Sequence, residues 1–474
     1  MENKNILFIM PSSNKSYKDV AVKSAAFHLP SLALAILGAV CKENGYIPKI
    51  LDLTFYEDDN EILSKTIKEF NPKHIGLTCT SATYFHALEI AKICKQINPD
   101  IPVVIGGPHA SASVENTLQN DCFDYVFIGE SEISFVKYLN GESREKIEGL
   151  AFKNKDGSIH RLDHSSYISN MDKIPFPDYT LYDMSLYSLS KLHTPDNPVI
   201  FLETSRGCPF KCKICNKIVH GYKFRPKSAE RVLDEIEHHI KTIGIKSFFI
   251  ADDGFTTDMK RSEDICDGIL ARKIKISWYC SNGIRADRIN QTLMHKMKKA
   301  GCYRVSFGIE SGNQKVLDNT GKNTTLEKIE TGIRMTKKAG IEAFGFFIVG
   351  FADDTEKTMD ETIKFANKLP LDYVKVSIAM PFPGTILYDE YNAQNLIFPP
   401  GDFRMYNFHL SPRSVYKHPS LDWEIVEKYY RKFYRSFYFN PAFILRRFIG
   451  SIKTGSFFNI AKVAVSIAFS QRKK

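Results

Sequence analysis

The chain has 474 residues, of which 43% are hydrophobic and 25% are charged, so it can form two or three globular domains and is not a disordered protein. Ten cysteines in a chain of this length exclude a disulfide scaffold, and the first residues run into a strand-like segment without a signal peptide, so we expect a cytoplasmic protein. The formal charge of +10 is concentrated at one end, because residues 428–474 hold eleven Lys or Arg and no Asp or Glu.

Residues 1–145 alternate predicted strands with predicted helices. The strands cover residues 6–10, 47–53, 74–79, 103–106 and 125–128, and the helices cover 32–44, 61–70, 84–97, 114–120 and 131–139. This alternation predicts a doubly wound, Rossmann-like α/β sheet that binds ligands at the carboxyl ends of its strands. Thr80 and Ser81 follow the third strand, and Gly106 and Gly107 follow the fourth. No G-x-G-x-x-G motif follows the first strand, which disfavours a nicotinamide cofactor.

Residues 146–197 form a predicted connector. Segments 147–153 and 158–161 flank the turn sequence Asn154–Gly157 and predict a small hairpin. Two prolines then interrupt regular structure within Ile174–Asp178. We assign no chemistry to this region.

Three cysteines, Cys208, Cys212 and Cys215, stand in a C-x3-C-x2-C spacing directly after the apolar run 199–202. Clustered thiolates suit a soft metal centre. A [4Fe–4S] cube usually takes four cysteines, so a loop with three leaves one iron open to an external ligand. Two alternatives are a zinc site completed by His220 and a set of structural thiols.

Residues 198–385 contain six predicted strands, each carrying a helix or a polar loop after it. The strands cover 199–203, 247–251, 276–281, 304–308, 343–349 and 373–379, and the helices cover 229–242, 259–271, 291–300, 326–339 and 355–369. The series predicts a partial (β/α)6 TIM-like barrel with its site at the carboxyl ends of the strands. Asp252, Arg285 and Glu310 follow three of these strands. Each could instead form an ordinary salt bridge or helix cap at the rim.

The cysteine spacing resembles that of the radical S-adenosylmethionine (SAM) superfamily. The resemblance implies that Cys208, Cys212 and Cys215 hold a [4Fe–4S] cluster whose free iron chelates SAM, and that reductive cleavage of SAM yields a 5′-deoxyadenosyl radical. It also implies that Asp252, Arg285 and Glu310 bind SAM, with Arg285 suited to a carboxylate. Phe210 would shield the cluster or stack near adenine, and a plain packing role stays open.

The first 145 residues resemble the cobalamin-binding domain that precedes many radical SAM enzymes, most clearly in Val104–Ala110 and Asp124–Glu132. The resemblance implies that the nucleotide tail of cobalamin lies beside Thr80, Ser81, Gly106 and Gly107. The D-x-H-x-x-G motif is absent and His109 lies in a different loop, so we expect no histidine below the cobalt. The alternative is a flavodoxin-like scaffold that has lost its ligand.

Residues 1–385 together resemble the cobalamin-dependent radical SAM subgroup, which includes methyltransferases and the anaerobic Mg-protoporphyrin ester cyclase. The resemblance implies methylation of an unactivated carbon of a small or lipid-like substrate, with a reductase, flavodoxin or ferredoxin as electron donor. Cyclisation, rearrangement or oxidation without methyl transfer, and a non-catalytic corrinoid sensor, stay open. A tRNA methylthiotransferase is disfavoured, because the N-terminal thiols form no second cluster loop (Cys41, Cys79, Cys94 and Cys122).

Residues 386–474 are predicted to be helical, basic and rich in aromatic residues. Tyrosines and phenylalanines interleave with Lys and Arg over residues 423–438, and apolar runs follow at 443–449 and 460–469, the latter too short to span a bilayer. Such helices suit peripheral contact with the inner face of a membrane, and a helical subdomain that covers the barrel is an equal alternative. No nucleic-acid recognition motif accompanies the basic residues, so we expect no nucleic-acid partner.

Overall fold

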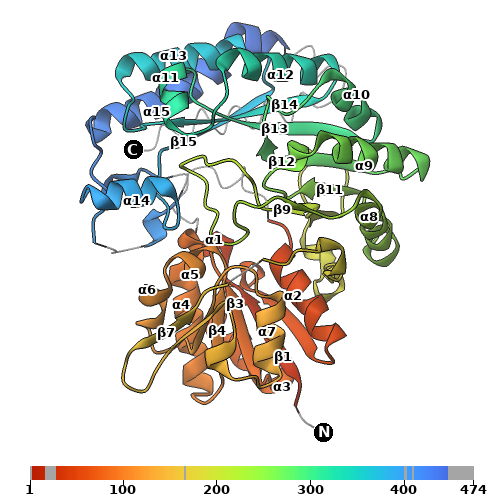
Figure 1. The fold of residues 1–474 in the computed structure, drawn as a ribbon, viewed down its shortest axis with the longest axis vertical. Helices are drawn as coiled ribbons and strands as arrows, with labels where there is room; N and C mark the ends of the chain where they lie inside the picture. The colour runs from red at the N-terminus through yellow and green to blue at the C-terminus, as the bar shows by residue number, and fades with distance from the viewer. Residues whose placement is uncertain (1–2, 17–27, 165–166, 400–402, 408–409, 447–474) are drawn as a thin grey trace.

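The computed structural model describes residues 3–16, 28–164, 167–399, 403–407 and 410–446. Two α/β halves are stacked on one another, with the N-terminal half in the lower part of Figure 1 and the barrel-like half in the upper part. Each half is built on a sheet with parallel strands, so the predicted fold class is confirmed.

The N-terminal half contains a seven-stranded sheet in the order β2-β1-β3-β4-β5-β6-β7. Its strands are β1 (Asn5–Met10), β2 (Ile47–Asp52), β3 (His74–Thr78), β4 (Val103–Gly106), β5 (Tyr125–Phe127), β6 (Leu150–Lys153) and β7 (Ile159–Leu162). The first five strands are parallel. The strand order switches between β1 and β3, because β2 lies on one side of β1 and the later strands lie on the other. The hairpin β6–β7, which the sequence places in the connector, pairs antiparallel with β5 and so extends this sheet.

Helices cover both faces of this sheet, and their ends follow local sequence signals. They are α1 (Ser13–Ser16), α2 (Leu32–Glu43), α3 (Asp59–Phe70), α4 (Tyr84–Ile97), α5 (Pro108–Ala112), α6 (Val114–Leu118) and α7 (Glu132–Leu139). The Asp58 side chain accepts a hydrogen bond from the Glu61 amide and begins α3, and Asn71 ends this helix in the left-handed conformation. In α5, Pro108 occupies the first turn, where its missing N–H has no cost.

The second half contains six parallel strands in sequential order, which make a partial barrel. The strands are β8 (Val199–Leu202), β11 (Ser247–Ile250), β12 (Ser277–Ile284), β13 (Cys302–Glu310), β14 (Glu342–Val349) and β15 (Tyr373–Ile378). The covering helices are α8 (Ala229–Ile243), α9 (Met259–Ala271), α10 (Gln291–Lys299), α11 (Gln314–Asn319), α12 (Leu326–Lys338) and α13 (Glu356–Lys368). Each of these helices begins at a capping side chain that accepts a backbone N–H three residues later (Ser228, Asp258, Asn290, Asn313, Thr325 and Thr355).

Helix α15 (Trp423–Tyr438) closes the exposed edge of the barrel sheet. Val426, Phe433 and Phe437 are buried in the barrel core. The Tyr434 hydroxyl accepts from the Val376 amide at 2.9 Å and donates to the Val376 carbonyl at 3.1 Å. Tyr438 makes the same pair of bonds one pleat away, and so the helix satisfies an edge strand that would otherwise be open to pairing. The described part of the tail therefore covers the barrel.

The C-terminal segment also joins the two halves. Tyr391 of α14 (Ile386–Ala393) and Phe403 are part of the core of the N-terminal half. The Phe403 ring lies 5.5 Å from that of Tyr84 and 4.5 Å from that of His109, measured between ring centroids. The apolar run 460–469 and residues 447–449 of the run 443–449 fall outside the described residues.

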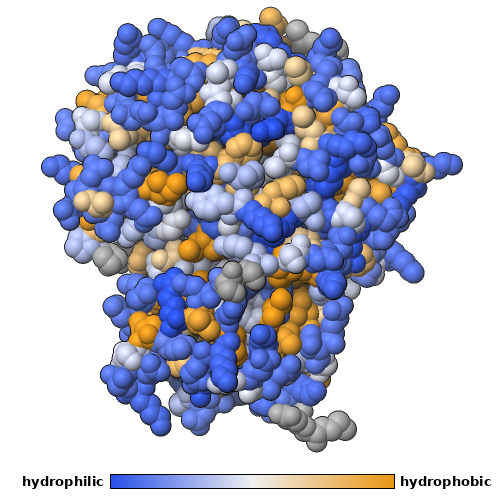
Figure 2. Space-filling model, in the orientation of Figure 1, coloured by the Kyte–Doolittle hydropathy of each residue, from blue (hydrophilic) through white to orange (hydrophobic). Residues whose placement is uncertain are grey.

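Hydrophilic residues dominate the face shown in Figure 2, and the hydrophobic residues on it are scattered. Three large hydrophobic side chains near the end of the described tail are at least half exposed, namely Phe439 (60%), Ile444 (50%) and Leu445 (61%). Among the described helices, none has the length and apolar character needed to cross a bilayer.

Candidate active site

The three cysteines lie in a loop whose two ends are held together at a short neck. The neck consists of β9 (Ser205–Arg206) and β10 (Arg225–Pro226), which pair antiparallel. Gly207 follows β9 with φ of +74°, and a Cβ at this position would lie 2.2 Å from the Lys223 carbonyl oxygen. Only glycine therefore lets the neck close. The loop, yellow-green in Figure 1, lies between the two halves.

All three thiols are free of disulfide bonds, with Cys208 buried and Cys212 and Cys215 half-buried. A hydrogen bond from Cys215 and the charge of Lys322 outweigh burial and lower the pKa of the Cys212 thiol to about 6. The Cys208 sulfur lies 3.9 Å from the position that a Cβ would take on Gly254, in the loop after β11. Gly254 therefore leaves space beside the Cys208 sulfur. The lowered pKa of Cys212 favours its thiolate, which is the form that binds metals.

Two lysines place positive charge beside the thiols. Lys322 is buried and pairs with Glu310 at 2.9 Å, and Lys217 lies 3.9 Å from Asp253. Burial lowers the pKa of Lys217, but the charges of Asp253 and of the cysteines outweigh it and raise the pKa above its usual value. Ammonium groups near three thiolates offset their mutual repulsion. The surroundings of the loop therefore suit an anionic centre.

His220 does not face the cysteines. Its Nδ1 lies 3.1 Å from Glu130 Oε1 and its Nε2 lies 3.8 Å from Glu203 Oε1, so each ring nitrogen faces a carboxylate. No three His, Cys, Asp or Glu side chains within the described ranges are grouped closely enough to hold one metal ion. His220 is therefore held by these carboxylates and does not complete a Cys3His set with the three cysteines.

Glu310 is held in a backbone conformation that is costly for a residue with a side chain. It ends β13 with φ of +65°, at a shift in the register between β13 and β14. A left-handed residue costs roughly 1–2 kcal/mol, and such strain concentrates at functional sites. A Cβ on Gly308 would lie 2.6 Å from Glu310 Oε1 and 2.8 Å from Lys322 Nζ, so this glycine makes room for the pair. The structure thus brings Glu310 beside the cysteine loop.

Arg285 and Phe210 meet directly. The Arg285 guanidinium lies 3.9 Å from the Phe210 ring centroid and forms a fork with Asp287, at 3.0 Å from Nε and 2.8 Å from Nη2. Its Nη1 donates to the Lys322 carbonyl at 2.6 Å. The arginine thus braces the cysteine loop against the loop that carries Lys322. Arg285 therefore forms an ordinary ion pair, with Asp287, and also lies against the cysteine loop.

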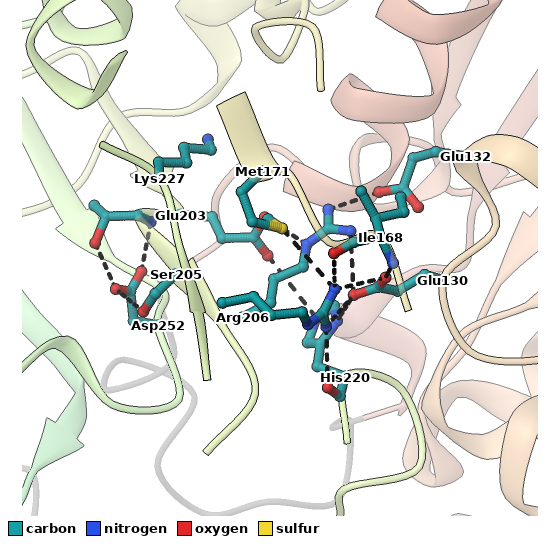
Figure 3. Close-up of polar contacts among 12 residues, drawn as sticks. Glu130, Glu132, Ile168, Met171, Glu203, Ser205, Arg206, His220, Lys227 and Asp252 are labelled. Atoms are coloured by element: carbon teal, nitrogen blue, oxygen red, sulfur yellow. Dashed lines mark hydrogen bonds and ion pairs between the residues drawn. The ribbon is translucent and has the colours of Figure 1, made fainter. Parts of the chain in front are cut away.

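Asp252 is hydrogen-bonded to neighbouring residues of the chain. It is buried, and its two oxygens accept from the Thr204 amide at 2.6 Å, the Thr204 hydroxyl at 2.5 Å and the Ser205 hydroxyl at 2.6 Å (Figure 3). These bonds fix the stretch that leads into the neck. Its neighbour Asp253 is exposed and faces Lys217. Two adjacent aspartates carry no sequence signal that tells which one turns inward.

The loops after β3 and β4 form a nearly neutral cradle at the carboxyl edge of the N-terminal sheet. Gly107 has φ of +95°, and a Cβ on it would lie 2.7 Å from the Cys79 carbonyl oxygen. Gly106 ends β4 in register with Thr78 of β3, and Thr80, two residues on, is exposed. Ser81 is buried, and its hydroxyl lies 3.0 Å from His109 Nδ1.

His109 is packed between aromatic rings below this cradle. It is 1% exposed, with ring centroids 4.3 Å from Tyr84 and 4.5 Å from Phe403. Burial lowers its pKa to about 3, so the imidazole is neutral. The imidazole is therefore enclosed by the protein.

A buried ionic network joins the two halves, and sequence analysis gave no indication of it (Figure 3). Glu130, in the loop after β5, accepts from Arg225 through both carboxylate oxygens at 2.6 and 3.0 Å. Arg206 pairs with Glu132 at 2.6 Å and with Glu203 at 2.8 Å. Burial raises the pKa of Glu130, but hydrogen bonds from His220 and Arg225 and the arginine charges outweigh it and lower the pKa to about 2. These partners are far apart in sequence, so no local pattern pairs them.

Comparison with protein families gives two matches. Residues 202–366 match the Radical SAM superfamily, and residues 18–139 match the B12 binding domain. An uncharacterized methyltransferase of Pyrococcus horikoshii is 34% identical over 457 residues, which cover 94% of this chain and 95% of the relative. The anaerobic magnesium-protoporphyrin IX monomethyl ester cyclase of Rubrivivax gelatinosus is 26% identical over 450 residues, which cover 93% and 78% of the two chains.

Among solved structures, the chain is similar to the radical S-adenosylmethionine methyltransferase TsrM from Kitasatospora setae, whose structure has cobalamin and a [4Fe-4S] cluster bound. The TM-score is 0.68 at 18% sequence identity, and the match covers 83% of this chain and 75% of that one. At this identity the similarity is one of fold.

Proposed function

The chain belongs to the cobalamin-dependent group of the radical SAM superfamily, and on that premise we propose that it methylates an unactivated carbon of a small or lipid-like substrate. The predicted family is confirmed, as are the cofactors of this family, which are SAM, a [4Fe–4S] cluster and cobalamin. The chain is an enzyme of a group whose members include methyltransferases. The substrate and the residue roles below are our proposals.

One observation carries the proposal: the cysteine loop lies where the carboxyl edges of both sheets meet. A Cβ on Gly384, after β15, would lie 3.0 Å from the Ala112 side chain of α5 and 3.1 Å from the Asn216 side chain. One residue of the N-terminal half, one of the cysteine loop and one of the barrel rim are therefore in contact. A corrin at the N-terminal cradle and a cluster in the loop would face the same space.

The residues of the loop fit a [4Fe–4S] cluster. Cys208, Cys212 and Cys215 supply thiolates, and Lys217 and Lys322 offset the charge of an anionic cluster. When bound, the cluster and SAM supply a radical that removes a hydrogen atom from carbon, and cobalamin carries the methyl group. The chain itself has to hold these groups within reach of one another and exclude water.

The methionine part of SAM carries an ammonium and a carboxylate, and the site offers partners for both. Glu310 and Asp253 are acceptors beside the cysteine loop, and Lys322 and Arg285 are cations on the same side. We assign SAM binding to this set and place Phe210 under the Arg285 guanidinium. Asp252 serves to fix the approach to the neck, because its oxygens already accept three hydrogen bonds.

The cradle fits the tail of cobalamin through backbone and hydroxyl groups. Gly107 lets the ends of β3 and β4 pack closely, since a Cβ on it would lie 2.7 Å from the Cys79 carbonyl oxygen, and Thr80 presents an exposed hydroxyl there. Ser81 holds His109 in place and supports the cradle from below. We propose that no histidine of this loop ligates the cobalt.

Anaerobically purified protein tests the proposal. Ultraviolet–visible and EPR spectra should show both an iron–sulfur and a cobalt signature, with about four irons per chain. Incubation with SAM, hydroxocobalamin and a reductant should form S-adenosylhomocysteine and 5′-deoxyadenosine together. Zinc in place of iron, or failure to bind cobalamin, would overturn the proposal.

Cyclisation without methyl transfer is a second candidate, because one relative that aligns with 93% of this chain is named a cyclase. The two reactions differ in one product. Methyl transfer consumes SAM to S-adenosylhomocysteine as well as to 5′-deoxyadenosine, and cyclisation yields 5′-deoxyadenosine alone. We propose flavodoxin or ferredoxin as the electron donor in either case.

We also propose peripheral contact with an anionic membrane through the C-terminal region. Phe439, Ile444 and Leu445 are exposed, and Arg431 of α15 is a basic residue of the same region whose side chain is 56% exposed. Basic residues beside exposed apolar ones bind anionic lipid surfaces. Co-sedimentation with vesicles that contain phosphatidylglycerol, and no co-sedimentation with neutral vesicles, is the expected result.

A further inference from the structure

We propose that Glu130 is a positioning residue through which cobalamin binding in the N-terminal half orders the cysteine loop of the barrel half. The inference rests on the proposed function, because it takes cobalamin to bind at the Gly106–Gly107 cradle. It goes further in assigning the communication between the two cofactor sites to one buried carboxylate.

Glu130 contacts both the neck and the body of the cysteine loop. Its carboxylate forms a two-bond fork with Arg225 of β10 and accepts from His220, which lies within the loop, at 3.1 Å. It also lies 3.5 Å from Arg206 of β9. Glu130 is 5% exposed, so these charges are held out of water. One side chain of the N-terminal half thus holds both strands of the neck.

Glu130 is linked to the Gly106–Gly107 cradle through its neighbour Gly129 and through Ser111 of α5. Gly129, directly before Glu130, donates its amide to the Ser111 hydroxyl at 2.9 Å. Ser111 belongs to α5, which begins directly after Gly107. A ligand that fixes Gly107 therefore restrains the helix to which the β5 loop is bonded. Ala112 of the same helix and Asn216 of the cysteine loop both lie beside Gly384, where a Cβ would be 3.0 Å from the first side chain and 3.1 Å from the second.

The charge balance makes the neck depend on the N-terminal half. Arg206 and Arg225 are register partners in the neck, and their guanidinium groups are almost completely buried. Three carboxylates face them, and two of these, Glu130 and Glu132, come from the N-terminal half. A buried charge that loses its partner is strongly unfavourable, so the closed neck requires the β5 loop in place. Cys208 is two residues beyond Arg206.

Amide hydrogen exchange of residues 207–224, with hydroxocobalamin as the probe, tests the inference without any turnover. In the wild type, hydroxocobalamin should slow exchange in this segment by at least about fivefold, a typical coupling between sites. Glu130→Gln keeps the shape of the side chain but removes the charge, and should reduce the response to less than about twofold. An unchanged response in Glu130→Gln would overturn the inference.

A matched control separates coupling from general loss of a buried charge. Glu235 is fully buried and pairs with Lys227 at 2.7 Å, and both residues belong to the barrel half. Glu235→Gln makes the same chemical change without touching the N-terminal half, so it should keep the full cobalamin response. A response that disappears equally in Glu235→Gln would contradict a special role of Glu130.

Glu132→Gln covers the case in which Glu130→Gln does not fold. Glu132 makes one contact with Arg206 and is on the rim of the network, so its loss should reduce the response only in part. The EPR spectrum of the reduced cluster gives a second readout, because hydroxocobalamin should shift it in the wild type and not in Glu130→Gln. A wild type with no cluster or no bound cobalamin would refute the proposed function, whereas a wild type with both and no response would refute this inference alone.

Discussion

The two halves of the molecule build their candidate cofactor sites by different means. The N-terminal cradle consists of glycines and hydroxyls at the ends of β3 and β4, and the His109 imidazole below it is buried and neutral. The cysteine loop is surrounded by charge, with Lys217 and Lys322 beside the thiols and a buried network at its neck.

This difference follows the chemistry of what each half would hold. A nucleotide tail and a corrin ring are bound by close backbone approach and shape, so a neutral, open turn is sufficient. A cluster with thiolate ligands carries net negative charge, and SAM carries charges of both signs, so a site for them needs fixed counter-charges in a buried setting. The comparison predicts that the halves fail under different perturbations.

Removal of the three thiols should have the largest effect and should be confined to one half. The Cys208→Ala, Cys212→Ala and Cys215→Ala triple variant is expected to lose bound iron and all SAM cleavage, because residues 207–224 contain no further cysteine. Its affinity for hydroxocobalamin should fall by no more than about fivefold, the lower end of typical couplings between sites. Iron analysis and a cobalamin titration check both, and retained SAM cleavage would contradict the assignment.

The same contrast explains how much of the site the sequence predicts. A local spacing is enough to identify Cys208, Cys212 and Cys215, and strand–helix alternation is enough to place Glu310 and Arg285 at strand ends. Alternation cannot choose between Asp252 and Asp253, because the two differ only in the way the backbone turns after β11. Here the structure engages Asp252 in the approach to the neck.

Contacts between distant segments account for what the sequence does not predict. Glu130 and Arg225 are 95 residues apart, and each alone reads as an ordinary charged residue. The hairpin β6–β7 is correctly predicted as a hairpin, but its pairing with β5 depends on a partner outside the local pattern. In the tail, basic and aromatic periodicity predicts an amphipathic helix and leaves open whether a membrane or the barrel receives its apolar face. The packing of Phe433 and Phe437 identifies the barrel for the described part.

Acid should weaken the charged half first. Glu130 has a pKa of about 2 against an ordinary value of 4.5, so the stability it confers is fully present above pH 4.5 and is lost as the pH falls toward 2. The free-energy difference between wild type and Glu130→Gln, from urea unfolding, should shrink by about 2 kcal/mol between pH 5 and pH 3. A difference that stays constant over this range would show that the Glu130 carboxylate is not held ionised by its partners.

A small change in the neutral half should affect cobalamin alone. Gly107→Ala places a methyl group 2.7 Å from the Cys79 carbonyl oxygen, so the ends of β3 and β4 must separate. We expect affinity for hydroxocobalamin to fall by about tenfold, or about 1.4 kcal/mol, with iron content unchanged. Gly157→Ala is the control, because Gly157 has a similar φ of +87° and no atom within 4 Å of the added Cβ. Equal affinities in the two variants would mean that close approach at Gly107 does not shape the cradle.

The sheets also end differently, and this gives the smallest expected effect. The N-terminal sheet extends through a hairpin beyond β5, whereas the barrel sheet ends at β15, whose amides and carbonyls bond to tyrosine hydroxyls of α15. Tyr434→Phe removes both bonds to Val376 and leaves the ring in place. Each of the two hydrogen bonds contributes about 0.5–1.5 kcal/mol net, so the free energy of unfolding should fall by at least about 1 kcal/mol in urea titrations.

Tyr222→Phe is the control for this change, because Tyr222 is 43% exposed and its substitution should alter stability by less than about 0.5 kcal/mol. Tyr438→Phe removes the equivalent bonds to Val374 and should cost as much as Tyr434→Phe. In the double variant the costs should add or exceed their sum, because the edge of β15 then loses both of its hydroxyl partners on neighbouring pleats. If neither variant differs from Tyr222→Phe, apolar packing of α15 alone closes the barrel edge.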